Sequence, residues 1–548
     1  MTRARALALV VACLVSGTLE ESRAQDAGTE PTPQNEAPAA EEPAPPQMTM
    51  YIREYRVTGT QVLPPIEVEK AVYPFLGPLR TTDDVEQARQ ALEKAYRDKG
   101  YQTVTVEIPP QRPRRGVIVM KVTENKVGRL RVNGARWFLP DQIRRHAPSL
   151  APGVVPNFEE VTRDIIALNG LADRRITPVL QPGVEPGTVD IDLNVKDTFP
   201  LHGSIEINNR YSPNTTPLRL NGSISYNNLW QLGHSVGFSA QVAPERTEDA
   251  LVYAGYYLFR APSWQRFSLM LQGTKQDSNV STLGGAAVAG RGEIVGIRAM
   301  ITLPGRPRFF HSLNFGVDYK HFDEDVQVGT ETFSTPIEYW PFTLGYSANW
   351  NREKSFTDLN LAVNFHARGM GSESVEFDNK RYSADGSYVY FRGDLSHTQD
   401  LPGGFQAYSK GQGQLTPNAL INSEQFAAGG VATARGYLES EMLGDNAYFG
   451  TVELRSPSFF GKSKNKEEGD EEPHEWRVYA FLEGGRVQSN NDLPGEVQRH
   501  DLASWGFGSR MKLFGHLNGS IDVAFPLIDA NPTLKDDVFV SFRAWAEF

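Results

Sequence analysis

The residues of this chain best suited to a specific polar interaction are one arginine and one glutamate in separate short motifs. Arg435 lies in the run Gly-Gly-Val-Ala-Thr-Ala-Arg-Gly-Tyr, and Glu483 lies in the run Phe-Leu-Glu-Gly-Gly. A guanidinium and a carboxylate that are shielded from water stabilise each other as an ion pair, whereas either charge alone in such a place is strongly penalised. This chemistry anchors one segment of a protein to another and breaks no bond.

Motifs of the common enzyme classes are missing from the sequence. It contains no HExxH motif, no paired metal-ligand spacing and no acidic calcium loop. It also lacks a nucleophile elbow, a phosphate-binding loop and a dinucleotide fingerprint. The formal net charge of -11 argues against nucleic acid as a partner. We therefore expect no enzymatic activity, no cofactor and no bound metal.

The C-terminal segment alternates between two faces and stops on an aromatic ring. The face opposite to the apolar one carries polar residues and is interrupted by Phe539 and Trp545. Lipid requires an apolar outer face and a closed barrel leaves no unpaired backbone edge, so this ending is typical of outer-membrane β-barrels. We predict a Gram-negative-type outer membrane and interpret Phe548 as the barrel-assembly signal. The apolar face consists of Val538, Val540, Phe542, Ala544, Ala546 and Phe548.

Similar alternating segments recur from Pro200 to the end of the chain. Residues 218–226, 295–301 and 359–368 each keep one face apolar, in the longest case for about ten residues, the length that crosses a bilayer at a tilt. The mean hydropathy is only -0.41, and no run approaches about 18 consecutive apolar residues, which excludes a helical span. We therefore predict that residues 200–548 form an all-β transmembrane barrel of about 16 antiparallel strands.

The alternation also orients the glutamate motif. Phe481 and Glu483 fall on the face that points into the lumen. A charge on the lipid face is destabilising, by about 2–4 kcal/mol for a cation at the bilayer midplane and by less for a carboxylate, so the inward placement of Glu483 is favoured. An arginine in a narrow lumen needs a carboxylate partner, and we expect Glu483 to be that partner for Arg435. The lipid-facing residues of this strand are Val478, Ala480 and Leu482.

The N-terminal segment, residues 1–24, is interpreted as a signal peptide. Arg3 and Arg5 precede a short apolar stretch, and a cleavage-site pattern ends at Ala24. A lipobox-like run ending in Cys13 is the alternative, in which Cys13 is lipidated. With ordinary cleavage the only cysteine leaves with the signal, so the mature chain has neither disulfides nor thiolate metal sites. Residues 25–50, rich in Pro, Ala and Glu, are expected to form an extended linker.

Residues 51–124 and residues 125–199 repeat one order of elements. An internal repeat of about 75 residues with the order βααββ is the pattern of POTRA domains, which are α+β units. Two unrelated small α+β domains are the alternative. The expected strands are 51–57, 103–108 and 117–122 in the first unit and 127–132, 176–180 and 189–195 in the second. The expected helices are 65–75 and 82–99, then 139–146 and 158–168.

Two POTRA units followed by such a barrel resemble a two-partner secretion transporter. This is the haemolysin-activator branch of the outer-membrane assembly-factor superfamily. The superfamily carries an Arg-Gly-Tyr/Phe motif, usually preceded by Val, at the tip of a sixth extracellular loop that folds back into the lumen. Arg435, Gly436 and Tyr437 match this motif, and Ala434 stands where Val is usual.

The resemblance also supplies a receptor for that loop. The superfamily places an inward-facing Phe-x-Asp-x-Gly motif on a following strand. Phe481, Glu483 and Gly485 match it, with glutamate in place of the usual aspartate. The resemblance therefore implies that Arg435 and Glu483 anchor the loop inside the barrel.

The function implied by the resemblance is secretion of one large partner exoprotein, haemolysin-like or adhesin-like, from periplasm to cell surface. The unfolded exoprotein would add to the edges of POTRA strands in the periplasm and then cross the lumen. The other expected partners are outer-membrane lipid and, during biogenesis, the barrel-assembly machinery. The alternatives are an insertase that assembles other barrels and an orphan barrel pore.

Overall fold

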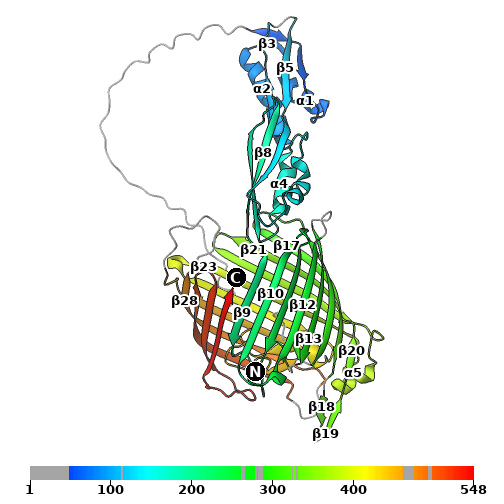
Figure 1. Ribbon diagram of the computed structural model, residues 1–548, viewed down its shortest axis with the longest axis vertical. Helices are drawn as coiled ribbons and strands as arrows, with labels where there is room; N and C mark the ends of the chain where they lie inside the picture. The colour runs from blue at the N-terminus through cyan, green and yellow to red at the C-terminus, as the bar shows by residue number, and fades with distance from the viewer. Residues whose placement is uncertain are drawn as a thin grey trace, which may run out of the picture.

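The computed structural model shows two small α+β units stacked end to end on one mouth of a β-barrel (Figure 1). It describes residues 49–112, 115–260, 266–277, 280–281, 288–289, 291–323, 325–328, 331–460, 474–491 and 497–548. The predicted signal peptide, Cys13 and nearly all of the predicted linker lie outside these residues. Among the described residues, no helix is long and apolar enough to cross a membrane.

The first unit is built on a three-stranded sheet with the order β2-β5-β4, in which β2 runs parallel to β5. The strand expected at 51–57 is interrupted at Arg53, because its first residues pair with β3 instead. Helix α2 begins with a capping box between Thr81 and Asp84. The elements are β1 (Met50–Ile52), β2 (Glu54–Thr58), α1 (Pro65–Val72), β3 (Gly77–Arg80), α2 (Thr82–Asp98), β4 (Val104–Glu107) and β5 (Val117–Glu124).

The second unit repeats this arrangement, with the sheet order β6-β8-β7 and β6 parallel to β8. The expected order βααββ is present in the second unit, whereas the first unit adds the short paired strands β1 and β3, of which β3 lies between α1 and α2. The units touch directly: the Phe158 N–H donates to the Gly100 carbonyl, and the Asn157 side chain donates to the Lys99 carbonyl. The elements are β6 (Lys126–Asn133), α3 (Pro140–Arg145), α4 (Phe158–Leu168), β7 (Arg174–Pro182) and β8 (Thr188–Asp197).

The barrel is closed and antiparallel, and β31 pairs with β9 to complete it. It has sixteen strands, since β20 and β21 both pair with β17 and form one strand broken at Trp340 and Pro341. The strands are β9 (Leu201–Asn208), β10 (Arg219–Leu229), β11 (His234–Val242), β12 (Leu251–Arg260), β13 (Phe267–Asp277), β16 (Gly292–Thr302), β17 (Phe309–Phe322), β20 (Ile337–Tyr339) with β21 (Phe342–Arg352), β22 (Ser355–His366), β23 (Tyr388–Asp400), β24 (Gln406–Leu415), β27 (Asn446–Arg455), β28 (Glu475–Gln488), β29 (Arg499–Leu513), β30 (Leu517–Pro526) and β31 (Phe539–Glu547).

Side chains alternate between the outer wall and the lumen along these strands. On β28, Leu482 is 58% exposed on the outer wall, whereas its neighbours Phe481 and Glu483 are 4% and 3% exposed. The two exceptions in the C-terminal pattern face inward and find aromatic or cationic partners. Phe539 packs against Tyr211, and Trp545 lies under the guanidinium of Arg543 at 4.1 Å.

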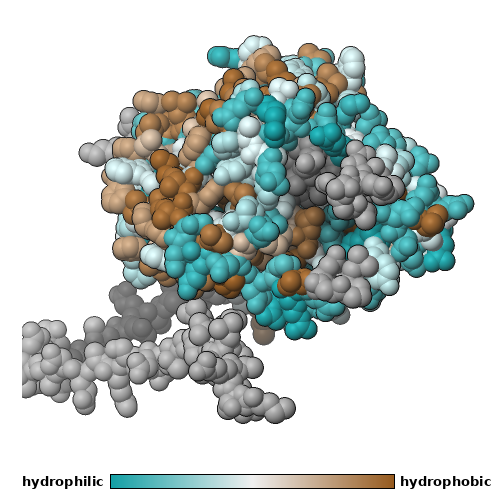
Figure 2. Space-filling model, turned by 90° about the horizontal axis from the view of Figure 1, so that it is seen from below, coloured by the Kyte–Doolittle hydropathy of each residue, from teal (hydrophilic) through white to brown (hydrophobic). Residues whose placement is uncertain are grey.

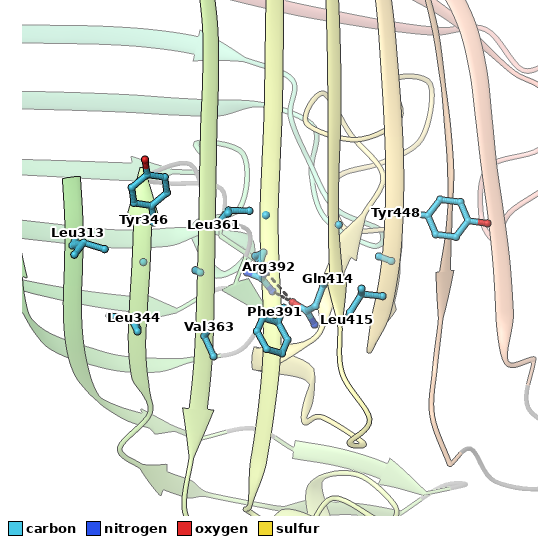
Figure 3. Close-up of a pocket in the computed structure, with 15 residues that line it drawn as sticks. Leu313, Leu344, Tyr346, Leu361, Val363, Phe391, Arg392, Gln414, Leu415 and Tyr448 are labelled. Carbon is cyan, nitrogen blue, oxygen red and sulfur yellow. Dashed lines mark hydrogen bonds between the residues drawn. The ribbon is translucent and has the colours of Figure 1, made fainter. Parts of the chain in front are cut away.

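The outer wall is apolar but not smooth. A hollow of about 580 Å³ spans β17 to β27, and Figure 3 shows the residues that line it. Gly393 on β23 lies opposite Gly413 on β24, so two neighbouring strands lack side chains at this point. Leu361, Phe391 and Leu415 stand around it. The wall is therefore thin here and would be covered by lipid chains.

The barrel end away from the α+β units is closed in by the longer loops and, seen end-on in Figure 2, carries many hydrophilic residues. The near end, where the C-terminus lies, meets the second unit (Figure 1). Small elements lie in the far loops: β14 (Val280–Ser281), β15 (Val288–Ala289), β18 (Asp325–Val328), β19 (Glu331–Ser334), α5 (Ser374–Lys380), β25 (Phe426–Ala428) and β26 (Met442–Gly444).

The second unit is fixed to the first two barrel strands. The carboxylate of Asp173 lies 2.6 Å from the His202 ring of β9. The side chain of Gln231, in the turn between β10 and β11, accepts from the Leu139 N–H at the start of α3. Asn228, near the end of β10, donates to the Trp137 carbonyl. These contacts place the second unit beside one side of the barrel mouth.

Candidate functional site

The candidate site is the loop between β24 and β27, residues 416–445, which we call loop 6. It is the sixth connection at the far end, and its short ribbon of β25 and β26 turns back into the barrel. The tip is almost inaccessible: Ala434, Arg435 and Tyr437 are 0%, 3% and 1% exposed. A buried arginine requires specific partners, and the facing strands supply them.

Arg435 and Glu483 are directly paired. The Arg435 Nε and Nη2 atoms lie 2.9 and 2.6 Å from Glu483 Oε1. The other carboxylate oxygen, Oε2, accepts from the Arg435 backbone N–H at 2.6 Å. The guanidinium carbon also lies 3.6 Å from the centre of the Phe481 ring. Glu483 thus satisfies both of its carboxylate oxygens on one residue of loop 6.

Two further carboxylates bind the same arginine, and sequence reasoning did not identify them. Arg435 Nη2 lies 2.7 Å from Glu453 on β27, and Nη1 lies 3.1 Å from Asp522 on β30. Both residues alternate with outward apolar neighbours, which was the signal that could have placed them in the lumen. Their convergence on one arginine depends on the strand register, which the sequence does not reveal.

The three carboxylates and three arginines form one network. Glu453 also accepts from Arg455 at 2.7 Å and from Arg510 at 3.4 Å. Asp522 accepts from the Tyr479 hydroxyl at 2.7 Å. Formal charges within the network cancel, and most of its groups are buried, so its energy depends on every member keeping its partners.

The other predicted motif residues have packing roles in the same place. The Tyr437 hydroxyl lies 3.0 and 2.8 Å from the carbonyls of Ala503 and Ile528, so it reaches β29 and the last loop. Gly436 has a φ of +98°, a conformation that L side chains rarely adopt. At Gly485 a Cβ would lie 2.2 Å from the Tyr448 carbonyl oxygen, so a side chain there would collide with β27.

The base of loop 6 is held by a second set of charged groups. Asp445, which is fully buried, accepts from Arg381 Nη1 and Nη2 at 2.6 and 2.9 Å. It also accepts from the backbone N–H groups of Leu420 and Asn490. Arg381 belongs to loop 5, residues 367–387, and Asn490 to loop 7, residues 489–498. The ion pair therefore joins loops 5 and 6, and hydrogen bonds from its two members to Asn490 attach loop 7.

Glu424 anchors the other limb of loop 6 to the barrel wall. Its carboxylate accepts from Lys320 at 2.5 Å, from the Tyr339 hydroxyl at 2.6 Å and from the Tyr390 hydroxyl at 2.8 Å. These partners come from β17, β20 and β23. Loop 6 is thus held at its tip by β27, β28 and β30 and on its other limb by β17, β20 and β23.

The terminal aromatic lies at the barrel seam. The Phe548 N–H donates to the Gly203 carbonyl, and the Gly203 N–H donates to Phe548 O, at 3.0 and 3.1 Å. The ring of Phe548 covers Gly203, where a Cβ would lie 2.4 Å from a ring carbon. The residue therefore extends the pairing of β31 with β9 while most of its ring stays on the outer wall.

Two protein-family models match the chain. One, described as haemolysin secretion/activation protein ShlB/FhaC/HecB, covers residues 187–511. The other, described as POTRA domain, ShlB-type, covers residues 50–125. The first match spans more than half of the chain and includes both loop 6 and the strand of Glu483.

Individual proteins resemble the chain over nearly its full length. The outer membrane transporter CdiB of Escherichia coli O6:K15:H31 (strain 536 / UPEC) is 23% identical over 530 residues, covering 90% of this chain and 81% of that protein. The structure of CdiB from Escherichia coli has a TM-score of 0.66 at 19% identity and covers 93% of this chain and 92% of its own. BamA from Haemophilus ducreyi lacking POTRA domains 1-3 has a TM-score of 0.55 at 15% identity, covering 91% of this chain and 100% of its own. At these identities the structures show a shared fold.

Proposed function

The chain belongs to the haemolysin secretion/activation protein family, and from that premise we propose how its parts divide the work of export. It is a two-partner secretion transporter of the outer membrane, its α+β units are POTRA domains in the periplasm, and its partner is a secreted exoprotein. The near end of the barrel is thus periplasmic and the far end extracellular. In our proposal the POTRA units capture the unfolded exoprotein, and loop 6 controls its passage.

Capture by the POTRA units is proposed to occur by strand addition. In both sheets the central strand is the last one, β5 or β8, so β4 and β7 are edges. An edge presents unpaired backbone groups to which an extended segment can add, and main-chain hydrogen bonds of this kind tolerate many sequences. On β7, Val179 and Leu180 are exposed and offer apolar contacts beside that edge.

The observation that carries the proposal for loop 6 is the buried network around Arg435. The loop enters from the cell surface and occupies lumen space beside β27 to β30, yet it is held there by noncovalent contacts that can be exchanged. No nucleotide is available in the periplasm to drive transport. Folding of the exoprotein at the surface withdraws the exported part from the equilibrium and gives the process its direction.

Biogenesis is proposed to depend on the C-terminus. Phe548 completes the seam between β31 and β9 and presents its ring on the lipid-facing wall. The barrel-assembly machinery would recognise this terminal strand before the seam closes, and lipid would cover the apolar wall afterwards.

The experiment that tests the proposal compares the medium and the outer membrane of wild-type and deletion strains by quantitative proteomics. A transporter predicts that one large exoprotein disappears from the medium while porins remain at their normal levels. The alternative function is the insertion of other barrels into the membrane. We consider it because the chain shares its fold with BamA. It predicts a general fall in outer-membrane barrels with no specific loss of an exoprotein.

A further inference from the structure

The lumen has two unlike walls, and only one of them is left open by loop 6. On β27 to β29 the inward residues Thr451, Glu453, Glu483 and Ser504 are all less than 9% exposed, because loop 6 lies against them. On β10 and β12 the inward residues Ser223 and Tyr256 are exposed. Among the described residues, loop 6 therefore leaves the lumen open along the strands that follow the POTRA domains in sequence.

This open wall differs from the rest of the lumen in its chemistry. Among the described residues of β10 to β13, inward-facing charge occurs only near the two ends, at Arg219 and Arg260. Between them the inward positions carry hydroxyl, amide and apolar groups, among them Asn221, Ser223, Ser225, Ser239, Ala254, Tyr256, Leu258, Met270, Gln272 and Thr274, whereas Gln241 and Gln276 are buried at the far end. By contrast, the wall from β16 to β24 carries ion pairs and charged hydrogen bonds such as Arg298 with Asp318 and Arg392 with Gln414.

We propose that the exoprotein crosses the lumen as an extended chain along the inner face of β10 to β13, which we call the serine wall. The inference rests on the proposed export function. Hydroxyl and amide side chains both donate and accept, so they can replace water around the backbone of any sequence. A wall that carries no charged side chain between its two ends neither traps acidic residues nor rejects basic ones there, as a passage for a long and varied polypeptide requires.

The attachment of the second POTRA domain leads to the same wall. Its contacts with the barrel include Asn228 near the end of β10 and Gln231 in the turn that joins β10 to β11. Leu171 of this domain also packs over Gly233 at the start of β11. A segment held at the POTRA edge would therefore meet the pore beside the periplasmic ends of β10 and β11 and would not need to cross the mouth.

One aromatic residue on the serine wall lies against its neighbouring strand. A Cβ at Gly237 would lie 2.3 Å from a ring carbon of Tyr256, so the absence of a side chain at this position makes room for the ring. The ring therefore rests on the wall instead of projecting fully into the lumen. An apolar side chain of the exoprotein could pack against the face of this ring, and the ring would not block the path.

The test places the photo-crosslinking residue p-benzoylphenylalanine at Ser223, Ser239 or Thr274 of the full-length chain in cells. Matched positions on the other wall are Ser347 of β21 and Asn360 of β22, which face the lumen opposite each other. Ile224 serves as the lipid-facing control. Adducts are recovered through a tag on the transporter and identified by mass spectrometry. The inference predicts exoprotein adducts at the serine-wall positions, several-fold more than at Ser347 or Asn360.

A second arm measures export directly. Ser239→Glu should lower the amount of exoprotein in the medium several-fold, whereas Ser347→Glu should stay near wild type, with heat-modifiability confirming that both barrels are folded. Equal or stronger adducts and defects on the Ser347 wall would overturn the path while leaving export itself intact. If deletion of the whole chain removes no exoprotein from the medium, the proposed function falls and the path falls with it.

Discussion

Arg435 and Glu453 are paired at 2.7 Å although neither belongs to the other's motif. Loop 6 is therefore anchored by more than the pair of Arg435 with Glu483. Glu453 is shared with Arg455 and Arg510, whereas Glu483 has Arg435 as its only cationic partner among the ion pairs of the described residues. Loss of Arg435 therefore removes the paired cation of Glu483, whereas Glu453 keeps Arg455 and Arg510.

The first prediction concerns a charge swap. Arg435→Glu combined with Glu483→Arg should not restore export, because the new carboxylate at position 435 would face Glu453 and Asp522. A buried unpaired charge costs about 3–5 kcal/mol, which no single pair in the network offsets. Export is measured as exoprotein in the medium at equal levels of folded barrel. Recovery of export by the double variant above both single variants would contradict the three-carboxylate account.

The second prediction concerns a conservative change in the receptor. Glu483→Asp should be mild, with export reduced by less than about threefold, because Glu453 and Asp522 continue to hold the guanidinium. Glu483→Gln should be worse, since the charge is lost while the volume is kept. The same secretion measurement applies, and a more severe defect in Glu483→Asp than in Glu483→Gln would argue against charge pairing as the main contribution.

Much of this arrangement could be predicted from the sequence, because alternation and turn residues are local signals. The orientation of Glu483 and the outward C-terminal face come from a period of two residues. The pairing of Arg435 with Glu483 came from the family resemblance, since their distance in space depends on register. For the same reason Glu453, Asp522 and the ion pair of Arg381 with Asp445 could not be predicted: each joins segments that only a closed barrel brings together.

The third prediction concerns the base of loop 6. Arg381→Ala leaves the buried carboxylate of Asp445 without its cation and unties loops 5, 6 and 7, so the outer mouth should loosen. Single-channel conductance in planar bilayers should rise or fluctuate more than in wild type. Arg381→Lys keeps the charge but loses the bidentate contact, so its conductance should lie between those of wild type and Arg381→Ala. A conductance trace identical to wild type in Arg381→Ala would show that the pair does not hold the mouth closed.

The fourth prediction concerns barrel assembly. Deletion of Phe548 removes two backbone hydrogen bonds at the seam and the ring over Gly203, so the heat-modifiable, membrane-inserted fraction should fall. Phe548→Tyr keeps both the ring and the backbone and serves as the matched control. Unchanged insertion on deletion would mean that the terminal aromatic is incidental to assembly.

The fifth prediction concerns the outer POTRA domain. Removal of residues 51–124 takes away one strand-addition edge but leaves the second domain attached to the barrel through Asp173 and His202. Helix α4 of that domain keeps its own cap, since Asn157 accepts from the Glu159 N–H at 3.0 Å. The barrel should still insert, and the exoprotein should accumulate or be degraded in the periplasm. A broad porin defect would point instead to an insertase.

The most direct measurement of the central claim is the amount of exoprotein that Arg435→Ala delivers to the medium when it replaces the wild-type chain. The variant barrel must be present in the outer membrane at wild-type level and heat-modifiable, and the porins serve as the internal reference. We predict that the exoprotein falls at least about tenfold, because loop 6 loses its buried anchor and Glu483 its partner. Wild-type secretion by Arg435→Ala at equal barrel levels would contradict the account.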